Sequence, residues 1–148
     1  TDATEALMSS KAIFNFATDY YYKNPTITSL DNFKFTNKDF NSFTTFLSSD
    51  TTFVTQQEEL FEKAFSTSTS KNLAKEYESI KQKLFEAKIE EISKNKDILF
   101  NVLEEEIIEK YFYKEGVFQY QLKNDKAIFE AQSLLKNQEK YNAILSGK

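Results

Sequence analysis

The sequence predicts an all-α domain, and three of its features support this prediction. Only 2 Gly and 1 Pro occur among 148 residues, although sheet-rich and loop-rich folds need these residues for tight turns. Hydrophobic residues make up 40% of the chain, with 15 Phe and 8 Tyr, which is enough apolar surface for a core. Apolar residues also recur at spacings of three and four. We expect one domain, residues 1–148, built as an irregular bundle of about six or seven helices.

The first predicted helix begins near Glu5 and ends at Asn24. Its apolar side is formed by Ala6, Leu7, Ile13, Phe14, Ala17, Tyr20 and Tyr21. The ring of Pro25 disfavours the helical conformation for Asn24. We interpret residues 26–35 as an extended connector in preference to a strand.

Two capping signals mark the next two helices. Thr36 followed by Asp39 is expected to cap a second helix, with apolar residues at Phe40, Phe43, Phe46 and Leu47. Thr55 and Glu58 form a full capping box. A third helix is expected after it, with an apolar side at Leu60, Phe61, Ala64 and Phe65. This helix is expected to stop in the Ser/Thr-rich stretch 66–70.

The longest periodic run covers residues 71–93. Its main stripe is Leu73, Tyr77, Ile80, Leu84 and Ala87, widened by Phe85, Ile89 and Ile92. Such a stripe packs against another helix. Residues 94–97 predict a turn, and a second long helix over 97–115 is expected to end at Gly116 as its C-cap. Because the link is short, we expect one long antiparallel helical hairpin.

The last part of the chain is expected to be helical as well. Residues 117–123 fit either a strand or a helix, and we favour the helix. Asn124 is expected to cap a helix over 125–137, with Ile128, Ala131, Leu134 and Leu135 directed inward. Residues 138–145 form a final short helix through Tyr141, Ile144 and Leu145.

Composition narrows the classes of function. The chain has no Cys, no His and no Arg, so thiol nucleophiles, imidazole bases and nearly all zinc sites are excluded. We expect no catalytic residue, cofactor or metal. The net charge is -4, so the chain has no positive field to attract a phosphate backbone, and we expect no nucleic-acid partner. No apolar run reaches the roughly 20 residues that a membrane span needs. The first residues do not resemble a signal peptide or a natural start. We therefore interpret the chain as a piece of a longer protein.

Residues 102–116, VLEEEIIEKYFYKEG, contain three consecutive glutamates. A helical projection places Phe100, Leu103, Ile107 and Tyr111 on one stripe and Glu105, Glu106 and Glu109 opposite. Glu104 lies at the edge of the stripe. We interpret it as a boundary carboxylate bonded to a Lys, a Tyr hydroxyl or a backbone group. The alternative, an acid-base or metal pair, lacks a second inward carboxylate.

Two aromatic triplets form the candidate interaction surface: Tyr20, Tyr21 and Tyr22, and Tyr111, Phe112 and Tyr113. Three consecutive rings surround a helix, so at least one ring of each triplet is expected to face outward or meet a partner. The alternative interpretation is a half-buried tyrosine with a solvated hydroxyl.

Four stretches carry a family resemblance: AIFNFATDYYYKNPTI, FKFTNKDFNSFTTFL, LEEEIIEKYFYKEG and KNQEKYNAIL. In this order the chain resembles the helical C-terminal region of carboxyl-terminal processing peptidases (tail-specific proteases) of Bacteroidetes-type bacteria. The resemblance implies a parent serine protease of the periplasm or cell envelope, with a PDZ module and a Ser-Lys peptidase core before Thr1. The catalytic Ser and Lys of that family match no position here.

The resemblance implies a non-catalytic accessory domain that serves subunit association, placement of the PDZ module, or docking of a substrate or adaptor. The expected partners are therefore proteins: its own peptidase core, a second subunit, a substrate or an adaptor. The alternative is a stand-alone helical module that binds a protein segment in an apolar groove. An enzyme in its own right would need a nucleophile, base or metal ligand that the sequence does not offer.

Overall fold

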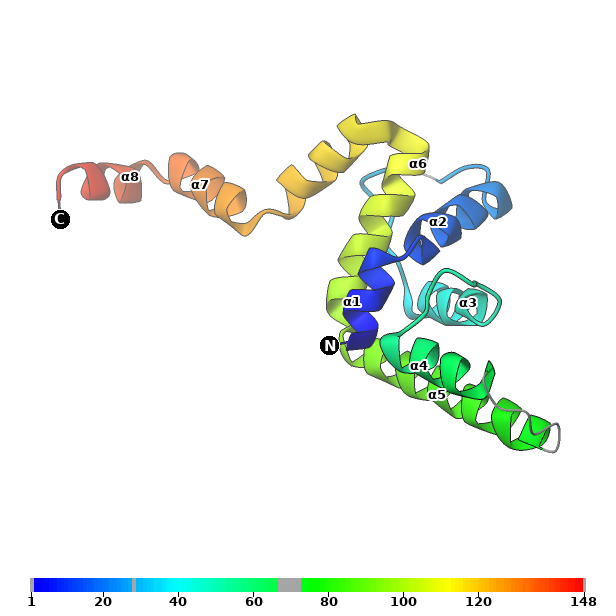
Figure 1. Cartoon of the computed structure of the whole chain (residues 1–148). Coiled ribbons are helices and arrows are strands. Elements are labelled where there is room, and N and C mark those ends of the chain that lie inside the picture. The colour runs from blue at the N-terminus through cyan, green and yellow to red at the C-terminus, as the bar shows by residue number, and fades with distance from the viewer. Residues whose placement is uncertain (1, 28, 67–72, 148) are drawn as a thin grey trace.

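The computed structural model describes residues 2–27, 29–66 and 73–147, and within them it contains eight helices and no strand (Figure 1). The all-α prediction is confirmed, with slightly more helices than expected. Thr28 and residues 67–72, where we placed the end of the third helix and the start of the fourth, lie outside the described residues. The helices are α1 (Asp2–Ser9), α2 (Ala12–Lys23), α3 (Asn37–Leu47), α4 (Gln56–Ser66), α5 (Ala74–Lys94), α6 (Lys96–Asn124), α7 (Lys126–Lys136) and α8 (Gln138–Leu145).

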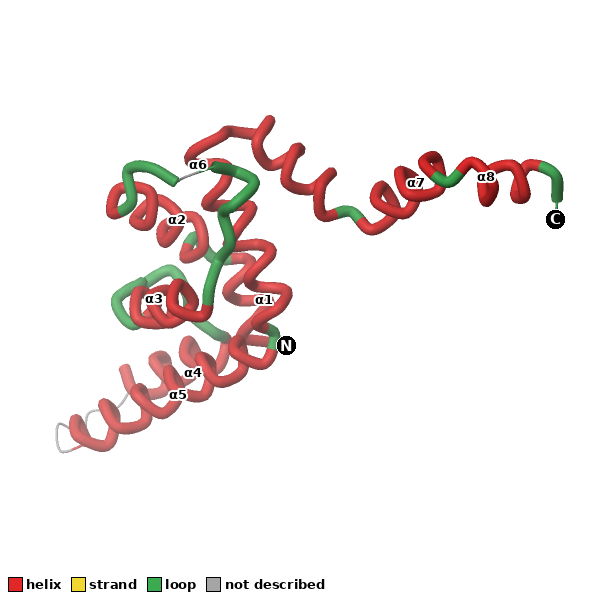
Figure 2. Tube along the Cα trace, turned by 180° about the vertical axis from the view of Figure 1, so that it is seen from behind, coloured by secondary structure: helices red, strands yellow, loops and turns green. Residues whose placement is uncertain are grey.

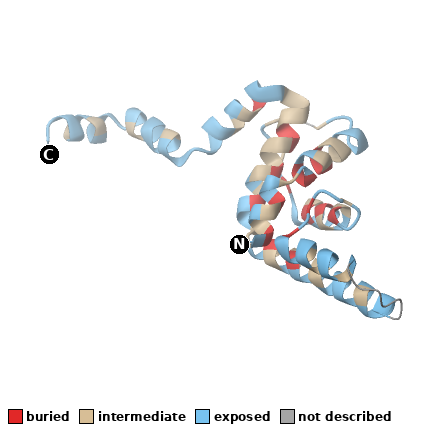
Figure 3. Cartoon of the chain, viewed as in Figure 1, coloured by how far each residue is buried: buried red, intermediate tan, exposed pale blue. Residues whose placement is uncertain are grey.

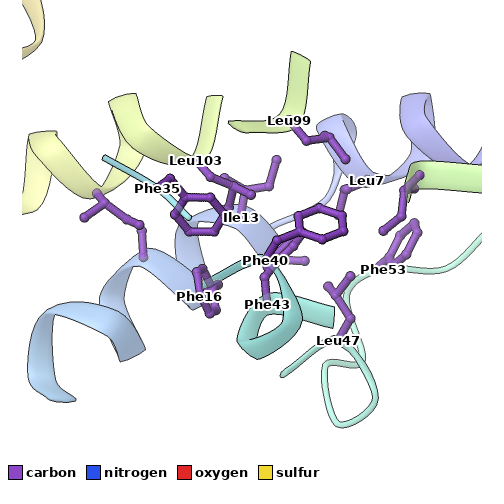
Figure 4. Close-up of a cluster of buried hydrophobic side chains, with 14 of the residues drawn as sticks. Leu7, Ile13, Phe16, Phe35, Phe40, Phe43, Leu47, Phe53, Leu99 and Leu103 are labelled. Atoms are coloured by element: carbon purple, nitrogen blue, oxygen red, sulfur yellow. The ribbon is translucent and has the colours of Figure 1, made fainter. Parts of the chain in front are cut away.

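A single core lies between α1, α2, α3, the C-terminal end of α5 and the first part of α6, with Phe35 from the connector and Phe53 from the segment before α4. Rings from α2, the connector, α3 and α6 meet edge to face. The ring centroids of Phe16 and Phe43 lie 5.0 Å apart, and those of Phe35 and Phe100 lie 5.2 Å apart. Figure 4 shows this cluster beside Leu99 and Leu103 of α6. Edge-to-face rings add to the stabilisation from burial. The apolar stripe predicted on α6 is therefore in the core.

The first predicted helix is in fact two helices, α1 and α2, which meet at Ser10. The Ser10 hydroxyl donates to the Leu7 carbonyl at 2.7 Å and accepts from the Ala12 amide at 3.1 Å. These local bonds replace helical backbone bonds. Because the chain turns here, Leu7 and Phe16 both reach the core.

Both predicted helix starts are confirmed. The Asp39 amide donates to the Thr36 hydroxyl at 3.3 Å, and the Thr36 amide donates to Asp39 Oδ2 at 2.8 Å. The same reciprocal pair joins Thr55 and Glu58, at 3.3 and 2.8 Å. Each box satisfies amides that a helix leaves free.

The expected hairpin of the two long helices is not formed. Only Asn95 separates α5 from α6, yet the two helices diverge there (Figures 1 and 2). Instead α5 lies antiparallel to α4 and contacts α1, while α6 runs along α2. The apolar face of α6 is already covered by the aromatic cluster. The predicted stripe of α5 is therefore divided. Ile92 is buried in the core and Tyr77 stacks on the rings of Phe61 and Phe65 of α4, whereas Leu73 and Ile80 stay exposed.

Lys88 of α5 is a buried cation that the sequence pattern did not mark. Its Nζ donates to the Phe53 carbonyl at 2.7 Å and lies 2.8 Å from Glu58 Oε1. The two side chains are only 8% and 16% exposed. The ammonium also lies 4.3 Å from the centre of the Phe53 ring. Lys88 thus joins α5 to α4 and to the segment before it.

The longest helix, α6, does not end at Gly116. Its backbone leaves helical geometry at Tyr113, where the chain bends, and is helical again up to Asn124. Gly116 is buried in this bend, where an added Cβ would lie 2.2 Å from Phe112 Cβ. Glycine is therefore needed for close approach and not as a C-cap. Residues 117–123 are helical, as favoured. The N-cap of α7 is Asp125, one residue beyond the predicted Asn124.

Residues 114–147, which we call the arm, extend away from the core (Figures 1 and 3). All of them are described, and Gly116 is the one buried residue among them. The predicted inward positions Ala131 and Leu135 are exposed. The amphipathic patterns of α7 and α8 correctly predicted helices but not a buried face within this chain.

Ile107→Ala is expected to lower the free energy of unfolding by about 2–4 kcal/mol, because Ile107 is fully buried. Ile98→Ala on the same helix is the matched control, since its side chain is 57% exposed, and a change below about 0.5 kcal/mol is expected. Urea denaturation measures both. Equal losses would contradict the packing of α6.

Lys88→Met is expected to destabilise the domain by about 3 kcal/mol, because it leaves the largely buried Glu58 carboxylate without its cation. Lys94→Ala removes the exposed pair with Glu90 and is expected to change stability by less than about 0.5 kcal/mol. Thermal and urea unfolding compare the two. A Lys88→Met protein as stable as Lys94→Ala would refute the buried pair.

Candidate functional site

The sequence-predicted site residues lie on two helices: α2 carries one aromatic triplet near its C-terminal end, and α6 carries Glu104 and the second triplet near its bend. Contact between α2 and α6 brings parts of the two triplets together. The bend then determines which rings can meet.

The aromatic patch is formed by Tyr21, Tyr22 and Tyr111. The rings of Tyr21 and Tyr111 lie 4.9 Å apart, and those of Tyr21 and Tyr22 lie 5.7 Å apart. The Tyr111 hydroxyl donates to the Asn24 carbonyl, which ties α6 to the end of α2. Tyr22 is 78% exposed and makes the outer part of the patch. Tyrosines in this arrangement offer flat apolar area with polar edges.

The other three rings of the predicted surface lie elsewhere. Tyr20 packs into the core against Phe16 and Phe33. Phe112 lies against Gly116 inside the bend. Tyr113 is 73% exposed and lines an open hollow with Phe14, Glu106, Glu109, Lys110 and Lys114. The six predicted residues therefore divide among the core, the bend and two exposed places.

Glu104 is half-buried and accepts two hydrogen bonds. The Phe35 amide donates to Oε1 at 2.6 Å, and the Tyr120 hydroxyl donates to Oε2. Of the three partners left open by the sequence, the structure supplies the hydroxyl and the backbone group. Among the described residues no group of three or more acidic side chains could hold a metal ion. Glu104 instead links the connector, the first part of α6 and the arm.

Three polar contacts, which we call the latch, hold the arm against the rest of the domain. We call the described residues from Asp2 to Phe112 the body. Besides Tyr120 with Glu104, Gln121 Nε2 donates to Glu105 Oε2 at 3.1 Å, and Lys123 Nζ pairs with Asp31 at 2.7 Å. Sequence reasoning missed Tyr120, Gln121 and Lys123. Glu104 and Tyr120 are sixteen residues apart, so no helical spacing relates them until α6 bends.

The latch is opposed by strain in the backbone. Tyr113 has φ 58 and ψ -165, and it is the one non-glycine residue with positive φ in the described part of the chain. This region is nearly exclusive to glycine, and a side chain there costs about 1–3 kcal/mol. The two hydrogen bonds of the latch contribute about 0.5–1.5 kcal/mol each, and the exposed pair of Lys123 with Asp31 contributes less than about 0.5 kcal/mol. The free-energy cost of the strain at Tyr113 and the stabilisation from the latch are therefore of similar magnitude.

A groove between α2 and α3 is the other hollow of interest. Its lining is mixed: polar and charged residues such as Asp19, Lys38 and Asn41 outnumber Phe16, Tyr20 and Phe46, and both polar and apolar atoms face the groove. It is thus not the apolar groove that the stand-alone module would need. Large exposed apolar side chains are spread over several helices, among them Leu60 of α4, Ile80 of α5 and six residues of the arm.

One family model, described as "Probable PDZ-protease, C-terminal helical domain", matches residues 3–135. The match runs from α1 into α7 and so includes the core, the aromatic patch and the latch. No curated protein matches the chain, and no solved structure matches it. In the described residues, no helix is both long and apolar enough to cross a membrane.

Burial raises the pKa of Tyr120, and the hydrogen bond to Glu104 raises it further. A pKa above the unfolded value, near 10, means that this contribution to stability is present below about pH 10 and is lost as pH rises above it. In the unsubstituted protein the free energy of unfolding is therefore expected to fall as pH rises above about 10. We expect this fall to be smaller in Tyr120→Phe, and urea denaturation between about pH 8 and 12 measures it. Tyr22→Phe controls for removing a surface phenol. An unchanged alkaline slope in Tyr120→Phe would contradict this assignment.

Proposed function

This chain belongs to the family of C-terminal helical domains of probable PDZ-proteases, and from this premise we propose that its arm docks on the rest of the protease. In this proposal the domain is non-catalytic and places the PDZ module relative to the peptidase core. The core of the domain provides the rigid base from which the arm extends.

The exposed apolar surface of the arm carries this proposal. Side chains that would be buried in an ordinary helical bundle are more than half exposed along its three helical segments: Phe118 64%, Leu122 55%, Phe129 70%, Leu135 64%, Ile144 56% and Leu145 69%. Large exposed apolar surfaces of this kind mark protein contact sites.

The length of the arm helices points to a partner that is present continuously. α7 has 11 residues and α8 has 8, and helices this short are marginal in water without packing. Their N-caps are made, because Asp125 accepts from the Ala127 amide and Asn137 accepts from the Lys140 amide. Capping alone does not cover apolar faces. A partner in the same protein has a high effective concentration and would keep these faces covered.

The resemblance to tail-specific proteases supports finer proposals. We propose that the parent protein is a periplasmic serine protease with a Ser-Lys dyad, and that the aromatic patch contacts a substrate or an adaptor. Association with a second subunit through the arm is the alternative form of the docking role. The mixed lining of the groove between α2 and α3 argues against a stand-alone peptide-binding module.

In the protease that carries this domain, Phe129→Ser with Leu135→Ser is expected to reduce cleavage of an unfolded protein substrate at least about tenfold, because two anchor side chains of an interface are removed. Cleavage rate and solution mass, by analytical ultracentrifugation, are measured together. A lower mass would identify subunit association, and an unchanged mass would identify docking within the chain.

The matched control is Leu60→Ser with Ile80→Ser, which removes exposed apolar side chains from α4 and α5. This pair is expected to retain cleavage and mass. If both double variants cleave at the unsubstituted rate with unchanged mass, the arm has no docking role in the protease.

A further inference from the structure

The bend of α6 is held in a way that permits a second position of the arm. The strained residue is Tyr113, at φ 58, whereas the glycine lies three positions later at Gly116. A permanently bent helix would be less strained with glycine at position 113. A tyrosine there penalises the bent form and favours a continuous helix.

Locally, the sequence of α6 allows this continuous helix. No proline occurs between Lys96 and Asn124, and Gly116 is the single glycine. Glycine at 116 is also what makes the bend possible, because any Cβ would overlap Phe112. The segment therefore contains one residue that permits the bend and another that opposes it.

Straightening α6 would remove little packing from the body. Among residues 114–147 only Gly116 is buried, and no side chain of the arm belongs to the hydrophobic core. The contacts that the arm would lose are mainly the polar ones of the latch. The Phe35 amide would keep its bond to Glu104, since both groups belong to the body.

We propose that residues 113–116 are a hinge between a bent form, closed by the Tyr120 hydroxyl on Glu104, and an extended form in which α6 is one straight helix. The arm then takes two directions relative to the body, and a partner that prefers one of them shifts the equilibrium. This inference goes beyond the docking role and does not depend on it, because it concerns contacts within the chain.

Double electron-electron resonance between two spin labels tests the hinge. The chain contains no Cys, so Ser42→Cys in α3 and Ser133→Cys in α7, both at exposed positions, give two defined labels. In the labelled protein with an unsubstituted hinge, we expect the main peak of the distance distribution to be the label-to-label distance of the bent form.

Tyr120→Phe keeps the ring but removes the hydroxyl that Glu104 accepts. We expect the ratio of extended to bent molecules to rise about tenfold, the effect of losing one hydrogen bond to a charged group. Gly116→Ala is expected to make the extended form the main component, because its methyl group cannot fit the bend.

Tyr113→Gly is expected to act in the opposite direction and narrow the distances to those of the bent form, since it relieves the positive φ and weakens the straight helix. Tyr22→Phe, which removes a hydroxyl outside the latch, is the control and is expected to change nothing. If Gly116→Ala does not fold, the other two variants test the hinge. Opposite shifts of the label-to-label distances in Tyr120→Phe and Tyr113→Gly would support it. Identical distance distributions in these two variants would overturn it.

Discussion

Phenylalanine side chains from α2, the connector and α3 pack on one face of α6, and the arrangement of the other helices depends on this contact. Phe16, Phe35 and Phe43 meet edge to face beside Leu99 and Leu103 (Figure 4). Because the aromatic cluster covers this face of α6, α5 contributes only its C-terminal end, with Ile92, to the shared core. It diverges at Asn95 and packs on α1 and α4 instead. The body is therefore organised by competition for one helix face.

A second interaction holds α4 and α5 together and links them to Phe53 of the core. Glu58 closes the capping box of α4 through Oε2, and the buried Lys88 ammonium contacts both of its carboxylate oxygens. The Phe53 carbonyl and ring complete the surroundings of the cation. A buried charge of this kind adds directional constraint where apolar packing alone would allow α5 to slide. On the other side, the α1 amide of Ala3 donates to Glu91 of α5.

The arm contrasts with the body in the type of contact that holds it. Apolar burial fixes the body, whereas hydrogen bonds and one exposed ion pair hold the bend at Tyr113. Apolar side chains of the arm remain available for a protein partner, which agrees with a helical domain of a PDZ-protease. A body held by apolar packing, with a weakly held arm that exposes apolar side chains, is what the proposed docking role requires.

Local chemistry by itself determined the helical class and several helix boundaries, while tertiary contacts decided how the helices lie. Thr36 with Asp39 and Thr55 with Glu58 were predictable, since a capping box involves residues three positions apart. The partners of Glu104 were predictable only as types of group. Tyr120 lies sixteen residues away and reaches Glu104 because α6 bends. A periodic stripe of apolar residues predicts that a helix has an apolar face. Which element covers that face depends on the competition among all apolar faces of the folded protein.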